Sequence, residues 1–255
     1  MKKGWKIFWW TGGSLVIAGI LCCIVAFAMG ASVWDLQESY YGPSRSYEFS
    51  DIEELKISCS GELNIYTHEE DTIIVEAEGG SRRWRVECEQ EGSELDIEGK
   101  LRYQWFGNVS LGAIDVYVPE NYEFREVKIE VGAGLANVSQ LQARELKVEV
   151  GAGEANVDNF IVDQLKMTCG AGKLEAQGQL GEDAKIENGV GTVNLLLAGQ
   201  ELDYNYDVDC GVGEVLIGSN SHGGLGHSRQ IDNRANKDID VDCGLGEVSI
   251  TFDHH

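Results

Sequence analysis

The chain has 255 residues and a formal net charge of −23, because 43 Asp and Glu residues outnumber 20 Lys and Arg residues. Such a dense negative charge repels nucleic acids and anionic lipids, which argues against a protein that binds a phosphate backbone. The hydrophobic content of 43% is ordinary for a folded protein, and the length suits one sizeable domain or two small ones.

Residues 7–30 carry no charge and predict a single transmembrane helix. At ~1.5 Å per residue, a helix of this length crosses the ~30 Å hydrocarbon core of a bilayer. Three lysines precede the segment, so we expect residues 1–6 to form a cytoplasmic tail and the bulk of the chain to lie outside the cytoplasm, after a juxtamembrane linker at 31–50. The alternative is a cleaved signal peptide, because residues 26–28 offer small side chains near a cleavage site.

Residues 51–124 alternate apolar and polar side chains with a period of two, as at Leu55 and Ile57. This period predicts β-strands, and no convincing helical pattern follows the membrane span. Turns near Gly61 and Gly92 resemble those of the repeat that comes next. We therefore expect this early β region to be either a degenerate start of the same stack or a β-sandwich fused to it.

From residue 125 the sequence repeats, as in REVKIEVGAGLANVSQLQA and RELKVEVGAGEANVDNFIV. The Gly-x-Gly pairs begin at residues 132, 151, 170, 189, 211 and 244, and a period near 20 residues is typical of a solenoid. Each unit contains a strand, a glycine corner, a second strand and a polar return. We predict an all-β fold, a parallel β-solenoid of ~19-residue, two-strand rungs over 125–253, with the polar segment 219–237 extruded as a loop.

Aligning the units on their first glycine gives inward columns of apolar residues that form two facing walls. The residue before that glycine is Cys169, Cys210 or Cys243 in three of the units. Cys210 and Cys243 are expected in successive rungs, ~4.8 Å apart, but their parallel side chains disfavour a disulfide. We expect free, buried thiols, with Cys169 two rungs from Cys210.

The outward face of the first strand carries a column of lysines that ends in aspartates. In chain order the column reads Lys128, Lys147, Lys166, Lys185, Asp207 and Asp240, beside a mostly acidic column. The last two units lack the compensating lysines, which predicts an acidic patch made of Asp207, Asp209, Asp238, Asp240 and Asp242. This patch is either a solvated face that discourages aggregation or a weak site for Ca²⁺ or a basic partner.

No arrangement in the sequence indicates a catalytic centre, a cofactor or any other metal site. Each Gly-x-Gly is followed by a strand, whereas a nucleotide-binding turn requires a helix there. The five histidines are scattered over predicted loops and the C-terminus, without a metal-binding spacing. We predict that the protein is not an enzyme.

The ordered run of motifs resembles the DUF4097 family, labelled "putative adhesin". The resemblance rests on the segment IDVYVPENYEF, the consecutive Gly-x-Gly units after it and the closing DVDCGLGEVSITF, and it covers roughly residues 50–252. It implies a β-solenoid attached to a bacterial membrane, with no catalytic residues to transfer.

Together these features predict a membrane-anchored, extracytoplasmic binding or sensing module of the bacterial cell envelope, adhesin-like and without catalysis, whose partner is an envelope protein or a glycan. Two alternatives remain. One is a structural scaffold whose solenoids join end to end through an open final rung. The other is a glycan-active β-helix enzyme, which a groove with two convergent carboxylates would favour.

Overall fold

The computed structural model describes residues 45–79, 84–101, 111–221 and 226–253. The predicted membrane span at 7–30 lies outside these ranges. Within them, no helix is long and apolar enough to cross a bilayer.

The described residues form β-strands joined by short turns, with one 3₁₀ helix, η2 (Glu201–Asp203). The strands are β1 (Arg45–Phe49), β2 (Glu54–His68), β3 (Ile73–Gly79), β4 (Trp84–Glu91), β5 (Glu94–Leu101), β6 (Gly112–Pro119), β7 (Glu123–Val138), β8 (Leu141–Val150), β9 (Glu154–Cys169), β10 (Lys173–Leu180), β11 (Ala184–Asn188), β12 (Thr192–Ala198), β13 (Tyr204–Cys210), β14 (Glu214–Ile217), β15 (Asn220–Ser221), β16 (His227–Ile231), β17 (Lys237–Cys243) and β18 (Glu247–Asp253).

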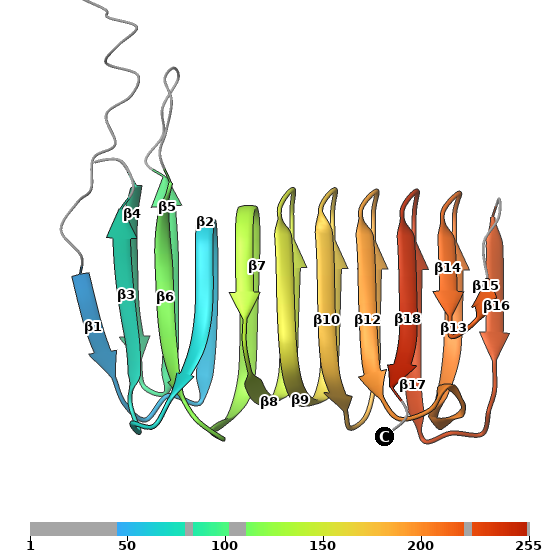
Figure 1. The fold of residues 1–255 in the computed structure, drawn as a ribbon, viewed down its shortest axis with the longest axis horizontal. Coiled ribbons are helices and arrows are strands. Elements are labelled where there is room, and N and C mark those ends of the chain that lie inside the picture. The colour runs from blue at the N-terminus through green and yellow to red at the C-terminus, as the bar shows by residue number, and fades with distance from the viewer. Residues whose placement is uncertain (1–44, 80–83, 102–110, 222–225, 254–255) are drawn as a thin grey trace, which may run out of the picture. The chain divides into compact units, whose positions relative to one another are not determined.

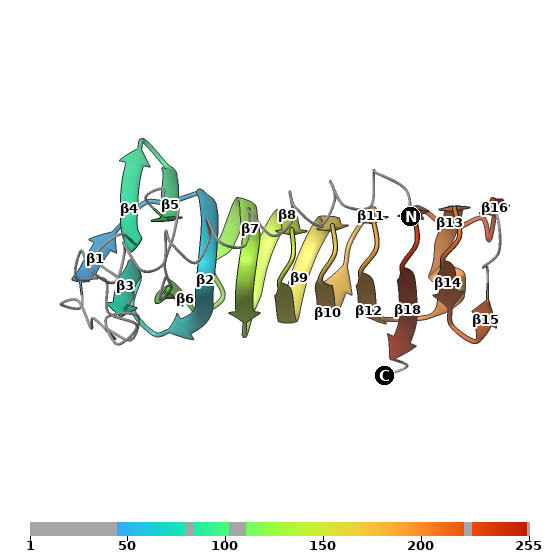
Figure 2. The ribbon, with the colours of Figure 1, turned by 90° about the horizontal axis from the view of Figure 1, so that it is seen from above.

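The strands stack into two sheets that face each other (Figure 1; in Figure 2 the first sheet runs along the upper side). The first sheet has the order β4, β5, β2, β7, β8, β9, β11, β17, β13, β16. The second has the order β1, β3, β6, β2, β7, β9, β10, β12, β18, β14, β15. Long strands such as β2, β7 and β9 contribute to both sheets. Along the first sheet, every neighbouring pair of strands from β5 to β13 is parallel. Along the second sheet, the same holds from β6 to β14, as the repeat predicts.

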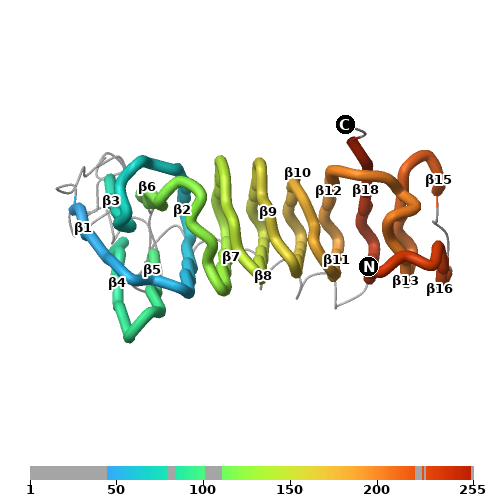
Figure 3. Tube along the Cα trace, turned by 90° about the horizontal axis from the view of Figure 1, so that it is seen from below, coloured from blue at the N-terminus to red at the C-terminus, as the bar shows by residue number. Residues whose placement is uncertain are grey.

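The last two rungs are stacked in the opposite order to their order in the chain. Ile239 of β17 pairs with Ala184 of β11 on one side and with Tyr206 of β13 on the other. The C-terminal rung, β17–β18, is therefore inserted between the rung at 184–198 and the rung at 204–217 (Figure 3). The expectation that units stack in chain order is wrong here, and Cys169 lies three rungs from Cys210, not two.

The polar segment 219–237 is not simply an extruded loop. It contains β15 and β16, which pair antiparallel with β14 and β13. These two strands cover the outer edge of the terminal rung, whose backbone N–H and C=O groups would otherwise lack partners. The open final rung that a filament would use is thus already occupied within the described residues.

The early region begins the parallel stack and adds antiparallel strands to it. β2 bends at Gly61, which pairs with Gly134, so β2 is a rung of the stack, and β5 and β6 pair parallel with its other side. Gly92, in contrast, lies at φ +63° between the antiparallel strands β4 and β5. The structure therefore agrees better with a degenerate start of the same stack than with a β-sandwich fused to it.

The core lies between the two sheets, and its columns are those that the repeat predicts. Along the second sheet, the six residues of one column are completely buried: Ala136, Ala155, Leu174, Val193, Val248 and Val215. Asn188 interrupts the column that otherwise holds Val and Cys next to the corners, and its Nδ2 donates to the carbonyl oxygens of Gly191 (2.9 Å) and Glu247 (3.0 Å).

The second glycine of each corner is required because successive rungs approach closely there. A Cβ on Gly191 would lie 2.5 Å from the Sγ of Cys169, and one on Gly213 would lie 2.8 Å from the Sγ of Cys243. The carbonyl oxygen of the facing glycine would lie closer still, at 2.3 Å for Gly191 and 2.2 Å for Gly213, so the backbones of adjacent rungs leave no room for a Cβ. Close approach, rather than positive φ, is therefore the main reason for the repeated glycine.

Candidate functional site

The lysine column on the outside of the first sheet is in register across five rungs. Lys56 of β2 precedes the four lysines predicted from the repeat and pairs with Lys128. The ladder then continues through Lys147 and Lys166 to Lys185. Lys56 was missed because its rung lies outside the visible repeat.

Each lysine of this ladder is neutralised by glutamates in the columns beside it. Lys147 contacts Glu145 at 2.8 Å and Glu126 at 3.0 Å. The hydrogen bond that Lys147 donates to Glu145 is the main reason why the pKa of Lys147 is raised. At the end of the ladder, Lys185 contacts Glu187 at 2.8 Å, and this hydrogen bond lowers the pKa of Glu187. Each lysine of the ladder thus forms at least one ion pair with a glutamate.

Beyond Lys185 the column becomes acidic, and the inverted order of rungs sets the neighbours. Lys185 pairs with Asp240, and Asp240 pairs with Asp207. The sequence predicted that Asp207 would follow Lys185 in the column, as it does in the chain. This order is wrong, because Asp240 lies between them. In the next column Asp242 pairs with Asp209 in the same way.

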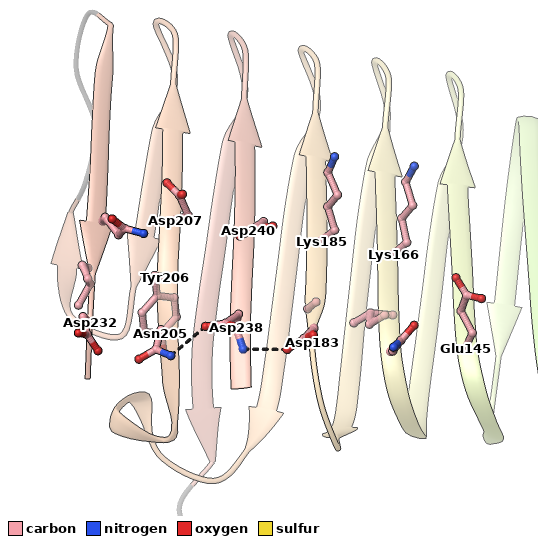
Figure 4. A pocket seen from close by; sticks show the side chains of 15 residues that line it. Glu145, Lys166, Asp183, Lys185, Asn205, Tyr206, Asp207, Asp232, Asp238 and Asp240 are labelled. Carbon is pink, nitrogen blue, oxygen red and sulfur yellow. Dashed lines mark hydrogen bonds between the residues drawn. The ribbon is translucent and has the colours of Figure 1, made fainter. Parts of the chain in front are cut away.

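A groove of about 690 Å³ lies over the transition from lysine to aspartate (Figure 4). Lys166 and Lys185 line one side together with Glu145, and Asp240 and Asp207 line the next two rungs. Its lower rim contains Asp183, Asp232, Asp238 and Asn205. The structure therefore places three of the five predicted acidic residues in one groove.

The other two, Asp209 and Asp242, line a separate hollow of about 750 Å³ beside the glycine corners. The acidic patch is thus divided between two depressions of the same face. Among the residues that the structure describes, no group of three or more His, Cys, Asp or Glu side chains is arranged to hold a metal ion. The weak calcium site stays a prediction.

Asn205 organises the rim of the groove, and sequence reasoning missed it. Its Oδ1 accepts hydrogen bonds from the backbone N–H groups of Asn233 (3.0 Å) and Ala235 (3.1 Å). Its Nδ2 donates to the Ala235 carbonyl oxygen (3.0 Å) and to Asp238 Oδ1 (2.8 Å). The backbone N–H of Asp238 in turn donates to Asp183 Oδ1 at 3.1 Å. The only signal was an asparagine at a position where other rungs carry Glu, Gln or Asp.

The electrostatics of the groove favour a positive charge near Asp240. Burial raises the pKa of Asp240, and the neighbouring carboxylates of Asp207 and Asp238 raise it further, while Lys185 opposes them. A cationic group between these carboxylates would relieve their repulsion. Asp207 and Asp240 project from the same face of adjacent strands.

Comparison with known families settles the classification. The model of the family described as Toastrack DUF4097 matches residues 52–206 and 123–251. The chain belongs to this family. The family resemblance read from the sequence is therefore confirmed, and the two-sheet stack described above is the form that the Toastrack fold takes in this chain.

The solved structures to which this chain is similar have low sequence identity with it. A "putative cell adhesion protein" from Clostridium sporogenes is 17% identical, with 83% of this chain and 100% of that chain covered and a TM-score of 0.47. A "putative adhesin" from Bacteroides fragilis is 10% identical, covering 82% and 96%, with a TM-score of 0.39. A "putative lipid binding protein" from Parabacteroides distasonis is 15% identical, covering 82% and 97%, with a TM-score of 0.37. No curated protein matches this Toastrack chain.

Proposed function

We propose that the chain is a non-enzymatic binding module of the bacterial cell envelope, anchored in the membrane by residues 7–30, and that the groove on the first sheet is its binding surface. The observation that carries this proposal is the change of charge within one groove, from Lys166 and Lys185 to Asp240 and Asp207. The names of the three structures compared above, two adhesion proteins and one lipid-binding protein, agree with a binding role.

The groove fits a ligand that carries a cationic and an anionic group a few ångströms apart. Its cationic group would lie over Asp207 and Asp240, whose repulsion it reduces. Its anionic group would lie over Lys185, whose side chain is 47% exposed despite its contact with Glu187. Free peptides and amino-bearing glycans of the envelope have this chemistry, and parallel strands hold the four side chains at fixed spacing.

A retention experiment tests the groove. Residues 50–255 are immobilised and incubated with solubilised envelope components, in the wild-type form and as the double variant Asp207→Asn, Asp240→Asn. The matched control is Glu89→Gln, Glu91→Gln, which removes two exposed carboxylates from β4 at the opposite end of the first sheet. We expect the control to retain the same components as the wild type and the groove variant to lose them. Equal retention by all three forms would contradict the proposal.

Membrane anchoring is tested separately. Protease added to intact cells should digest the region after residue 50, because the lysines before residue 7 favour a cytoplasmic N-terminus. A C-terminal tag that stays protected until lysis would show that this orientation is wrong.

A further inference from the structure

The middle residues of the Gly-x-Gly corners form a continuous column along one narrow edge of the stack, drawn uppermost in Figure 1. Backbone hydrogen bonds hold this column in register. The backbone N–H groups of Val190, Leu245 and Val212 each donate to the carbonyl oxygen of the first corner glycine in the neighbouring rung of the stack. The N···O distances are 2.8, 2.7 and 2.8 Å. Because the C-terminal rung is inserted, Leu245 lies between Val190 and Val212, although it follows both in the chain.

These three side chains are the apolar ridge. Their exposed fractions are 62% for Val190, 62% for Leu245 and 58% for Val212. Three earlier corners of the same column carry alanine instead, at positions 133, 152 and 171. Single exposed hydrophobic residues are common, but three in register on adjacent rungs form a contiguous apolar strip on a highly acidic protein.

Carboxylates border the apolar ridge on both sides. On the side of the first sheet, Asp242 and Asp209 are in-register neighbours. On the side of the second sheet, Glu247 and Glu214 are in-register neighbours. A hollow of about 750 Å³ on the first side includes Asp209 and Asp242, and the three ridge residues themselves line a hollow of about 720 Å³ that includes Glu214 and Glu247. The surface is therefore an apolar strip between two acidic rims.

We propose that the apolar ridge is a docking site for a protein segment whose apolar face is flanked by lysines or arginines, such as a basic amphipathic helix. Apolar contact with the three ridge side chains would provide affinity, and the acidic rims would select basic partners. A second copy of the chain is disfavoured as the partner, because its acidic rims would repel the acidic rims of the first copy. An anionic membrane is repelled for the same reason. This site is distinct from the groove of the proposed function.

The test uses the full chain and a short helical peptide of leucine and lysine, with the leucines in one stripe and lysines on both sides. Binding is followed by fluorescence anisotropy at low and high salt. In the triple variant Val190→Ala, Leu245→Ala, Val212→Ala, the corners acquire the residue already present in three other rungs, so the fold should persist, and thermal melting checks this. The control is Leu202→Ala, which removes a leucine that is 68% exposed on η2.

We expect the triple variant to weaken peptide binding about tenfold, while Leu202→Ala leaves it unchanged. Glu214→Gln, Glu247→Gln should weaken binding at low salt more than at high salt. Equal binding by the wild type and a folded triple variant would overturn the proposal, as would equal binding of a peptide with glutamates in place of lysines. Ridge-dependent binding to phosphatidylcholine vesicles without binding to the basic peptide would also overturn it, in favour of a lipid surface. Loss of the groove's ligand in the earlier experiment does not affect any of these results.

Discussion

Cys210 and Cys243 are in-register neighbours on the parallel strands β13 and β17, and both keep free thiols. Burial raises the pKa of Cys243, and the adjacent Cys210 raises it further. Both side chains project from the same face of the sheet, which is unfavourable for the dihedral angle of a disulfide. The close pair is therefore a packing element of the core.

We predict that the native protein has no disulfide between Cys210 and Cys243 and that its buried thiols react slowly with iodoacetamide at pH 8. The physical reason is that burial raises the pKa of Cys59 to about 11 and also raises the pKa values of Cys169 and Cys243, and only the thiolate reacts. Mass spectrometry of alkylated protein, before and after unfolding in urea, measures this. A quantitative crosslink between residues 210 and 243 would refute the prediction.

The close approach of rungs at the corners predicts a large effect of one methyl group. Gly191→Ala should destabilise the fold by about 3 kcal/mol, because the new Cβ overlaps the backbone of the Gly172 corner and the Cys169 thiol. Val190→Ala at the adjacent, exposed position should change the free energy of unfolding by less than about 0.5 kcal/mol. Adding Cys169→Ala to Gly191→Ala should restore only part of the lost stability, because the new Cβ still overlaps the backbone of Gly172. Urea denaturation measures all three, and full restoration would show that the thiol was the sole obstacle.

Repulsion between Asp207 and Asp240 predicts that Asp207→Asn raises the thermal midpoint at pH 7, whereas Glu120→Gln in an exposed turn does not. The raised pKa of Asp240 means that the folded chain binds this proton more tightly than the unfolded chain. The contribution of Asp240 to stability is therefore present at acidic pH. It is lost as the pH rises through the pKa of Asp240 in the folded chain. The difference between variant and wild type should accordingly shrink on acidification. A midpoint that falls in Asp207→Asn would contradict this.

The same melts test the calcium prediction. Site-specific binding at the acidic patch requires millimolar Ca²⁺ to raise the midpoint of the wild type more than that of Asp207→Asn, Asp240→Asn. Equal shifts would show that the acidic patch does not bind Ca²⁺ specifically.

The inserted rung predicts an unusual response to truncation. Removing residues 237–253 takes away the strands that connect β11 to β13 and β12 to β14. It also removes the stacking of Tyr204 on Phe252, whose ring centroids are 5.8 Å apart. Residues 204–221 should then lose their protection from hydrogen exchange, while the rungs up to residue 176 keep theirs. Retained protection at 204–221 would indicate that β13 and β14 can pair directly with β11 and β12.

Much of the fold is predictable because its signals are local. The period of two and the recurring glycines identify the strands, the corners and the buried columns. The order of the last rungs is not local, since YDVDCGVGEV and DIDVDCGLGEV have nearly the same pattern and either could follow β11. The capping strands β15 and β16 lie in a segment rich in Gly, Ser and Asn without alternation. The five acidic residues were predicted, but the groove depends on Asn205 and the loop that it holds, and neither has a distinctive pattern.

The inverted order of the final rungs also affects how the chain can fold as it is synthesised. Rungs up to residue 198 can be added one by one, each on the edge left by its predecessor. The next segment to emerge, 204–217, has no partner in place, because its permanent neighbour, residues 237–253, follows it in the chain. Its rung can therefore join the stack only after residues 237–253 are available to pair with it. Any interruption before residue 237 would leave a chain with an exposed strand edge, which favours pairing with other chains.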